Sequence, residues 1–332
     1  PKPNGASRIL ASLIGGKSRV LLMSGTPSVE TAAQLFHQFF VSGRGPWLGV
    51  DFYHWWRQPG HYKKAKSLGY GIAGAVKKGA KKASWMKEED DSPDYQEVHV
   101  KRIIDDVEPY VVKMPREEGG NKVLNATVIP CWLENPKLAA LIRRVKRHKV
   151  ATIGRHTVVY DAGPAQLNQG IHMMAGGTAI DEEGLVFRLD DEFDPEYRIR
   201  WMFEGMDKSR TYTIHCSYIG ERPFVREVLE RMGGVVWDDF ETMKKAGHGC
   251  WVGSLVSYAE GVDLSWLTGS QILYSLVWRG AKYSQVCDRQ LNFNRVEKAK
   301  VAVPLLRGGI DSDVFEAVSK KVNFNAKFYR EM

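Results

Sequence analysis

Residues 212–305 decide the fold, because short apolar runs recur there with amphipathic segments between them. The runs are YTIHC (212–216), VVW (235–237), CWVGSLV (250–256), ILYSLV (272–277) and KVAVPL (300–305). Runs of this kind are typical of buried strands. Apolar residues at helical spacing predict helices at 223–232, 240–246, 283–292 and 312–320. Because strands and helices alternate, we predict one α/β domain over residues 195–332, with a parallel sheet and helices on both of its faces.

The N-terminal 42 residues predict a helix, a buried strand and a second helix. The strand is Arg19–Met23 (RVLLM), it ends at Ser24-Gly25-Thr26-Pro27, and the second helix covers Val29–Phe40. Residues 43–120 are irregular and rich in Gly, aromatic residues and Lys. We expect only a helix near 97–106 and an extended piece at 110–114 within them.

The next part of the chain predicts a strand, a basic helix and a connector. Residues 123–132 (VLNATVIPCW) indicate a strand that Pro130 interrupts. Residues 135–149 indicate a basic amphipathic helix with Asn135 as the N-cap and Pro136 at its first position. We expect residues 157–193 to form a short helix and a Gly-rich, acidic connector.

The composition is that of a globular protein. The chain has 332 residues, of which 43% are hydrophobic and 26% are charged, which excludes a mostly disordered or fibrous chain. No run approaches 18 apolar residues, and the first residues lack the apolar core of a signal peptide. The four cysteines lie far apart, which argues against a disulfide framework or a CxxC zinc site. We therefore expect a cytoplasmic protein without a membrane span.

The positive charge is concentrated in one segment. The chain carries a net charge of +8, whereas residues 52–87 contain nine Lys and Arg and no Asp or Glu. The rest of the chain therefore sums to −1. A local excess of this kind favours a polyanionic partner, usually nucleic acid, over a solvated loop without a partner.

Gly15-Gly16-Lys17-Ser18 resembles the end of a phosphate-binding loop. Such a loop needs a Gly five positions before Gly16, where Ala11 stands, and it lies between a strand and a helix. Here a helix precedes the segment and a strand follows it. We interpret the segment as a basic turn.

Two later segments combine small, acidic and basic residues after an apolar strand. One is Ser257–Leu264 (SYAEGVDL), and the other begins with QVCDR at Gln285–Arg289 and continues to Arg295. An Arg in such a place can stabilise the charge that develops on a phosphoryl group. Taken singly, Arg289 and Gln285 could instead lie on a helix surface, and Asp263 could cap the turn that follows it.

Taken in order, these segments resemble the superfamily-2 helicases, specifically the Swi/Snf-like translocases and their phage-encoded relatives. SGTP matches motif III, residues 212–218 fall at motif IV, residues 257–264 match motif V, and residues 285–295 match motif VI. The run ILYSLVWRG with KYSQ is similar to the family's strand before motif VI. The resemblance covers most of the chain, although residues 43–120 match only loosely.

The resemblance implies two RecA-like lobes. Residues 1–45 would end the first lobe, residues 46–194 would form a basic insertion and connector, and residues 195–332 would form the second lobe. Residues 120–150 are an alternative part of the first lobe.

The sequence departs from the family pattern in two places. Asn292 stands where the second arginine of motif VI belongs, so either Arg295 supplies the arginine finger or the site is weakened. The family's phosphate loop and Asp-Glu box are not found upstream of Ser24. The resemblance thus implies the carboxyl-terminal portion of a longer helicase, which would not hydrolyse ATP alone.

The resemblance also implies the roles of individual residues and the cofactors, ATP and Mg²⁺. Arg289, Arg295 and Gln285 would contact the nucleotide phosphates, and Ser217, Ser257 and Tyr258 would contact nucleic acid. The residues expected to bind the nucleotide or couple it to lobe movement are Ser24, Gly25, Thr26, Gly261 and Asp263.

DNA is the expected partner, with RNA as an alternative, beside the missing part of the first lobe. Lysines interleaved with aromatic residues suit phosphate contact and base stacking. The lysines concerned are Lys63, Lys64, Lys66, Lys77, Lys78, Lys81 and Lys82. The basic helix at 135–149 is a second candidate track, unless it is simply a solvated face. A nucleic-acid-binding or annealing module without motor activity is the competing hypothesis, and a terminase-like motor fits the ordered motifs less well.

Overall fold

The computed structural model describes residues 5–14, 34–42, 45–47, 49–50, 62–64, 95–97, 105–111, 122–258, 262–277, 280–292 and 295–319. The chain divides into two compact units. One comprises Pro1–Lys113 with Asn323–Met332, and the other is Met114–Val322.

The smaller unit contains short elements. They are α1 (Gly5–Ile14), α2 (Gln34–Ser42), the antiparallel strands β1 (Tyr62–Lys64) and β2 (Tyr95–Glu97), and the 3-10 helix η1 (Glu108–Tyr110). Trp47 joins some of these pieces, because its ring stacks on Phe36 and its Nε1 donates to Asp106 Oδ2 at 3.1 Å. The predicted first and second helices are confirmed over the described residues, whereas the strand predicted at 19–23 lies outside them.

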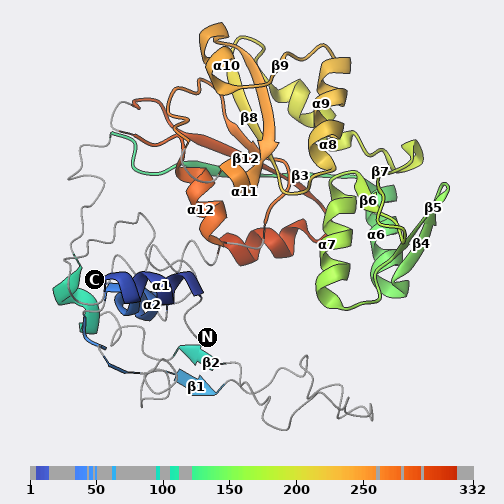
Figure 1. Ribbon diagram of the computed structural model, residues 1–332. Coiled ribbons are helices and arrows are strands. Elements are labelled where there is room, and N and C mark those ends of the chain that lie inside the picture. Colours follow the sequence, from blue (N-terminus) through green and yellow to red (C-terminus); the bar gives the residue numbers. More distant parts are fainter. Residues whose placement is uncertain are drawn as a thin grey trace, which may run out of the picture. The chain divides into compact units, whose positions relative to one another are not determined.

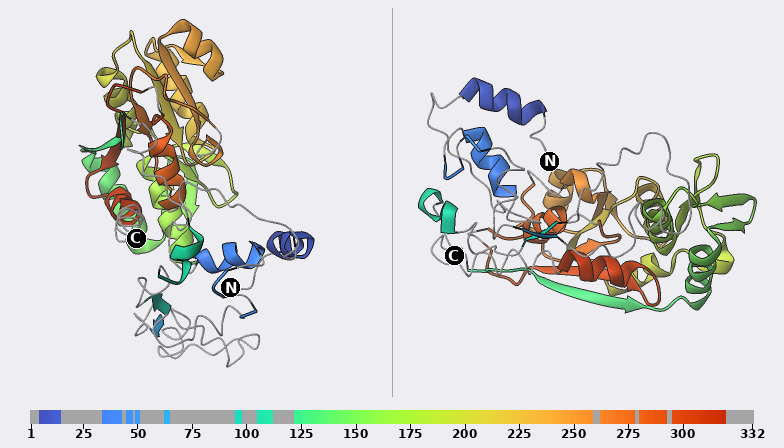
Figure 2. Two further views of the ribbon diagram at one scale, coloured as in Figure 1. Left: turned by 90° about the vertical axis from the view of Figure 1, so that its left-hand side faces the viewer. Right: turned by 90° about the horizontal axis from the view of Figure 1, so that it is seen from below.

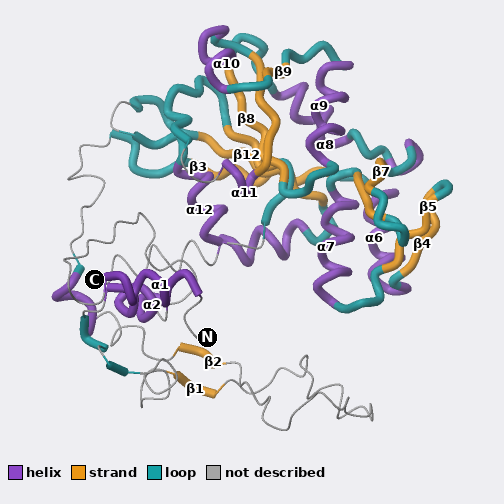
Figure 3. Tube along the Cα trace, in the orientation of Figure 1, coloured by secondary structure: helices purple, strands orange, loops and turns teal. Residues whose placement is uncertain are grey.

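A six-stranded parallel sheet organises the larger unit. Its strands are β3 (Thr127–Leu133), β8 (Thr211–Cys216), β9 (Val236–Trp237), β10 (Gly249–Ser254), β11 (Gln271–Leu273) and β12 (Lys300–Leu306). They lie in the order β3-β12-β11-β8-β10-β9, and every neighbouring pair is parallel. Figure 3 shows these strands together, with the helices of the unit around them. The predicted α/β class is confirmed.

The edge strand β3 corrects the predicted domain boundary. It pairs with β12 over its whole length, from Thr127 opposite Lys300 to Leu133 opposite Leu306. Pro130 lies within the strand and does not interrupt it, because a proline is tolerated where only one side of the strand is paired. The α/β unit therefore begins near Met114 rather than at residue 195, and residues 122–150 belong to it rather than to a separate unit.

The segment between β3 and β8 is more regular than the sequence predicts. It contains the helices α6 (Pro136–His148), α7 (Pro164–Ala175) and α8 (Tyr197–Gly205), the hairpins β4–β5 (Val150–Ile153, His156–Val159) and β6–β7 (Thr178–Ile180, Val186–Arg188), and the 3-10 helix η2 (Asp191–Phe193). Figure 1 shows α6 and α7 beside the two hairpins. The predicted start of α6 is confirmed, because Asn135 Oδ1 accepts a hydrogen bond from Leu138 N at 3.0 Å and Pro136 follows it.

The helices that follow β8 lie close to their predicted positions. They are α9 (Glu221–Arg231), α10 (Phe240–Ala246), the short α11 (Leu255–Tyr258), α12 (Gly280–Asp288) and a last helix at residues 311–319. The strand predicted at 272–277 is shorter, since β11 ends at Leu273.

Helices cover both faces of the sheet. Alternate residues of a strand point to opposite faces, so Val301 and Val303 of β12 pack in one buried cluster with Val286 of α12. Ile214 of β8 packs on the other face with Val225 of α9. The two views of Figure 2 show helices flanking the sheet from further directions.

Candidate functional site

Two loops that the sequence singles out meet at the amino-terminal ends of the parallel strands. We call residues 262–267 and 288–299, as far as they are described, the paired loops. They lead into the neighbouring strands β11 and β12, and Leu264 N donates to Arg289 O at 2.9 Å. Asn292 Nδ2 also donates to Ser265 Oγ at 2.5 Å. The segments that resemble motifs V and VI are thus held together by hydrogen bonds.

Arg295 supports the paired loops from within. It is only 6% exposed, and its Nη1 donates to Ser265 O at 2.9 Å and to Leu267 O at 3.1 Å. Its Nε and Nη2 donate to Glu297 O and Lys298 O. Burial lowers the pKa of this guanidinium. Four of its five N–H groups are therefore committed to backbone carbonyls, and no fork remains for a phosphate.

This geometry corrects the expectation that Arg295 could supply an arginine finger. Asn292, at the position of the family's second arginine, is also structural, because its Oδ1 accepts from Arg295 N at 3.0 Å. The Arg295 guanidinium is therefore turned to the backbone of the paired loops, and Asn292 supports that arrangement.

The other predicted residues of these loops differ in their surroundings. Asp263 is exposed and caps the following turn, since its Oδ1 accepts from Ser265 N at 2.9 Å. This is the alternative that the sequence left open. Gln285 lies half-buried on α12, and its Oε1 is buried without a hydrogen-bond partner among the described residues. Arg289 is half-buried just after α12, one turn from Gln285.

A polar groove adjoins the paired loops. It has a volume of about 540 Å³ and lies beside the amino-terminal ends of β8, β11 and β12. Its basic side chains come from Arg210, Lys298 and Lys300, and its acidic ones from Asp207 and Glu297. No local sequence pattern points to this set, because its members are scattered over about ninety residues and only the sheet brings them together.

A buried polar cluster lies at the other end of the strands, beyond the carboxyl ends of β8 and β11. Ser217, a predicted nucleic-acid contact after β8, is tied to Ser275 after β11. Its N donates to Ser275 Oγ at 2.7 Å, and its Oγ donates to Ser275 O at 2.8 Å. Ser275 Oγ donates in turn to Glu221 Oε2 at 2.5 Å. Burial raises the pKa of Glu221 to about 7, and the hydrogen bond from Ser275 opposes that rise.

A second set of buried charges lies close to this cluster. Arg198 Nη2 donates to Asp311 Oδ2 at 2.9 Å, and His172 Nε2 lies 3.3 Å from Asp311 Oδ1. His172 Nδ1 is 2.8 Å from the Tyr218 hydroxyl. Burial opposes the ionisation of Asp311, but Arg198 and His172 outweigh it and lower its pKa. The buried Arg198, His172 and Asp311 are thus linked to one another, although Arg198 Nε has no hydrogen-bond partner among the described residues.

Several predicted site residues lie outside the described part of the chain. They are Ser24, Gly25, Thr26, Gly261, Lys66, Lys77, Lys78, Lys81 and Lys82. Lys63 and Lys64 belong to β1, and Tyr258 ends α11, but their side chains are not described. Ser257 is exposed on α11, and its N donates to Ser254 Oγ at 3.3 Å.

The described residues offer no group of three or more His, Cys, Asp or Glu side chains with the arrangement of a metal site. Within the same residues, no helix has both the length and the apolar character that crossing a bilayer requires.

Comparisons with known proteins found similarity to solved structures only. No protein-family model matches it, and no curated protein does. One similar solved structure is the crystal structure of the C-terminal part of the Fun30 ATPase domain, with 9% identity and a TM-score of 0.31 over 40% of this chain and 53% of that one. Another is a DEAD box protein from the hyperthermophile Methanococcus jannaschii, with 14% identity and a TM-score of 0.30 over 38% of this chain and 37% of that one. The chain thus spans about half the length of the first and little more than a third of the second.

Proposed function

We propose that the Met114–Val322 unit is the second RecA-like lobe of a superfamily-2, ATP-dependent nucleic-acid translocase. The observation that supports this most directly is the hydrogen bond from Leu264 N to Arg289 O, which holds the motif V-like and motif VI-like segments together. The two segments also lead into the neighbouring parallel strands β11 and β12.

Only some of the predicted residues are suited to contact the phosphates of a nucleotide. The Arg289 guanidinium, with Gln285 one turn before it, would meet the phosphates and stabilise developing charge. ATP, when bound, would supply the free energy of phosphoryl transfer. Arg295 would keep both loops moving as one body, because it bonds to the backbone of each. The phosphate loop and the carboxylate for Mg²⁺ would come from outside these 332 residues.

The test uses the longest polypeptide that the gene encodes. We expect DNA-stimulated ATP hydrolysis, and we expect Arg289→Ala to lower its rate about a thousandfold, as for loss of an arginine finger. Arg307→Ala is the matched control, because the Arg307 side chain is exposed and forms an ion pair with the likewise exposed Glu134 at 3.4 Å. Full hydrolysis by the Arg289→Ala protein would refute the assignment of this residue.

A nucleic-acid-binding or annealing module is the second candidate function. It is favoured by the structural use of Arg295 and Asn292, which leaves the paired loops without a second arginine for the phosphates. This candidate predicts nucleic-acid binding that ATP does not change, with no hydrolysis by the longest encoded polypeptide. The 332-residue chain alone is expected to be inactive as an ATPase under either candidate.

A further inference from the structure

One face of α6 is strongly basic. The helix contains no Asp or Glu, and all of its cationic side chains, together with that of the C-cap residue, are exposed. We call this set the α6 basic face. It comprises Lys137, Arg143, Arg144, Lys146, Arg147 and Lys149.

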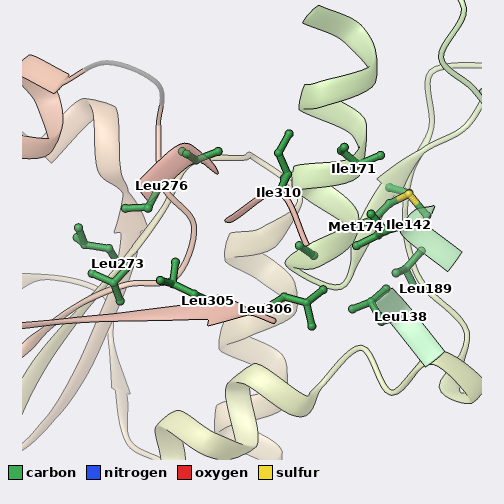
Figure 4. Close-up of a cluster of buried hydrophobic side chains, with 14 of the residues drawn as sticks. Leu138, Ile142, Ile171, Met174, Leu189, Leu273, Leu276, Leu305, Leu306 and Ile310 are labelled. Atoms are coloured by element: carbon green, nitrogen blue, oxygen red, sulfur yellow. The ribbon is translucent and has the colours of Figure 1, made fainter. Parts of the chain in front are cut away.

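The opposite face of α6 fixes the direction of these cations. Leu138 and Ile142 are 0% and 2% exposed and pack in the main buried cluster with Ile171 and Met174 of α7 and with Leu189. Figure 4 shows Leu138 and Ile142 pointing toward this group. The helix therefore cannot turn about its axis without exposing its apolar side, and the basic face stays directed to solvent.

Several charges of the α6 basic face destabilise the helix. None of its six side chains pairs with a carboxylate of the described residues, and like charges recur three and four positions apart, as between Arg143 and Arg147. Each such pair costs about 0.2–0.5 kcal/mol. Cations in the last turn suit the helix dipole, but Lys137 in the first turn opposes it. Lys149 also adopts the left-handed conformation, with φ 66°, where glycine is favoured.

We infer that the α6 basic face binds the phosphate backbone of a nucleic acid, an inference that rests on the proposed function. Arg143 and Arg147 are one helical turn apart, about 6 Å along the axis, and Arg144 lies beside them on the exposed side. Arginine binds phosphate through two N–H groups at once, which suits repeated contact along a strand. An acidic membrane fits less well. Apart from His148, the exposed positions of α6 that carry no charge are only Pro136 and Ala140, so α6 itself presents no large apolar side chain for insertion.

The test measures binding of a fluorescent 30-nucleotide DNA, single-stranded and duplex, by anisotropy between about 50 and 300 mM salt. In the full 332-residue chain, the triple variant Arg143→Gln, Arg144→Gln, Arg147→Gln should weaken binding at least tenfold at 100 mM salt. Each lost phosphate contact should also reduce the slope of log K against log salt by about 0.7–0.9, so by about 2–3 in all. The Arg→Lys triple variant keeps the charges and should keep most of the slope.

The matched control removes three exposed cations from elsewhere in the same unit, at Lys208, Lys244 and Lys245. It has the same net charge as the first variant and should retain the wild-type slope within about 0.5. Equal losses in both variants would overturn the inference, because the effect would then follow net charge alone. Circular dichroism and thermal unfolding establish that each variant is folded.

The outcomes separate this inference from the proposed function. If the wild-type chain binds no nucleic acid at any salt concentration, both fail. If it binds and the α6 variant binds equally well, only the α6 inference fails. If the α6 variant loses binding to vesicles with 30% anionic lipid but not to DNA, the face is a membrane contact and the inference is overturned.

Discussion

Replacing Glu221 by Gln tests the buried carboxyl group at the start of α9. Glu221 is 0% exposed, and its Oε2 accepts hydrogen bonds from Tyr218 N at 3.2 Å and from Ser275 Oγ at 2.5 Å. Its Oε1 is buried without a hydrogen-bond partner among the described residues. Burial raises its pKa to about 7, against the opposing effects of the Ser275 hydrogen bond and of the neighbouring His172 and Arg198.

The magnitude follows from the difference between the folded and unfolded proteins. The unfolded carboxyl group releases its proton near pH 4.5, whereas the folded one keeps it up to about pH 7. The contribution of Glu221 to stability is therefore fully present below about pH 4.5 and is lost as the pH rises to about 7. At about 1.4 kcal/mol per pH unit, the loss is about 3 kcal/mol. Gln keeps the shape and cannot ionise, so Glu221→Gln should escape this loss.

Urea unfolding followed by tryptophan fluorescence, from pH 4.5 to 8.5, measures the effect. The unfolding free energies of Glu221→Gln and the wild type should agree within about 1 kcal/mol at pH 4.5. At pH 8 the variant should be more stable by about 3 kcal/mol. Glu227→Gln, a change at an exposed residue of the same helix, should follow the wild type throughout. A difference between Glu221→Gln and the wild type that does not change with pH would refute the reasoning.

Three further predictions concern other buried polar groups. Arg295→Met should lower the unfolding free energy by about 2–4 kcal/mol, because the carbonyls of Ser265 and Leu267 lose a charged donor. Amide hydrogen exchange should become faster in the paired loops and stay unchanged in α6. Burial lowers the pKa of His215 to about 4, so its contribution to stability is present above pH 6.5 and is lost as the pH falls to about 4. In urea titrations, His215→Gln should abolish this acid-dependent loss of about 3 kcal/mol in the unfolding free energy. A pH profile like that of the wild type would contradict the prediction. Asn135→Ala should lower the unfolding free energy by about 1–2 kcal/mol, because α6 loses its N-cap bond. Asn135→Asp should not restore this stability, because Asn135 Nδ2 also donates to Phe193 O and Asp194 O and a carboxylate cannot; wild-type stability of the Asp variant would contradict this account.

Local signals located many of the elements correctly. The N-cap and proline that begin α6, and the bounds of α10 at Phe240–Ala246, agree with the sequence because capping and helical periodicity depend on neighbours a few residues away. The α/β class followed in the same way from the alternation of apolar runs and helices. Pro130 was misinterpreted, since its effect depends on which side of β3 is paired.

The sequence by itself determined the element types, the α/β class and the segments of interest. Only the tertiary structure decided that β3 joins the sheet, that Arg295 supports the paired loops instead of reaching a ligand, and that Arg210 shares a groove with Lys298. The physical reason is that strand pairing, burial and the use of each hydrogen-bond donor depend on residues far away in the chain. The same holds for Glu221, whose pKa is set by burial among residues that no local pattern connects.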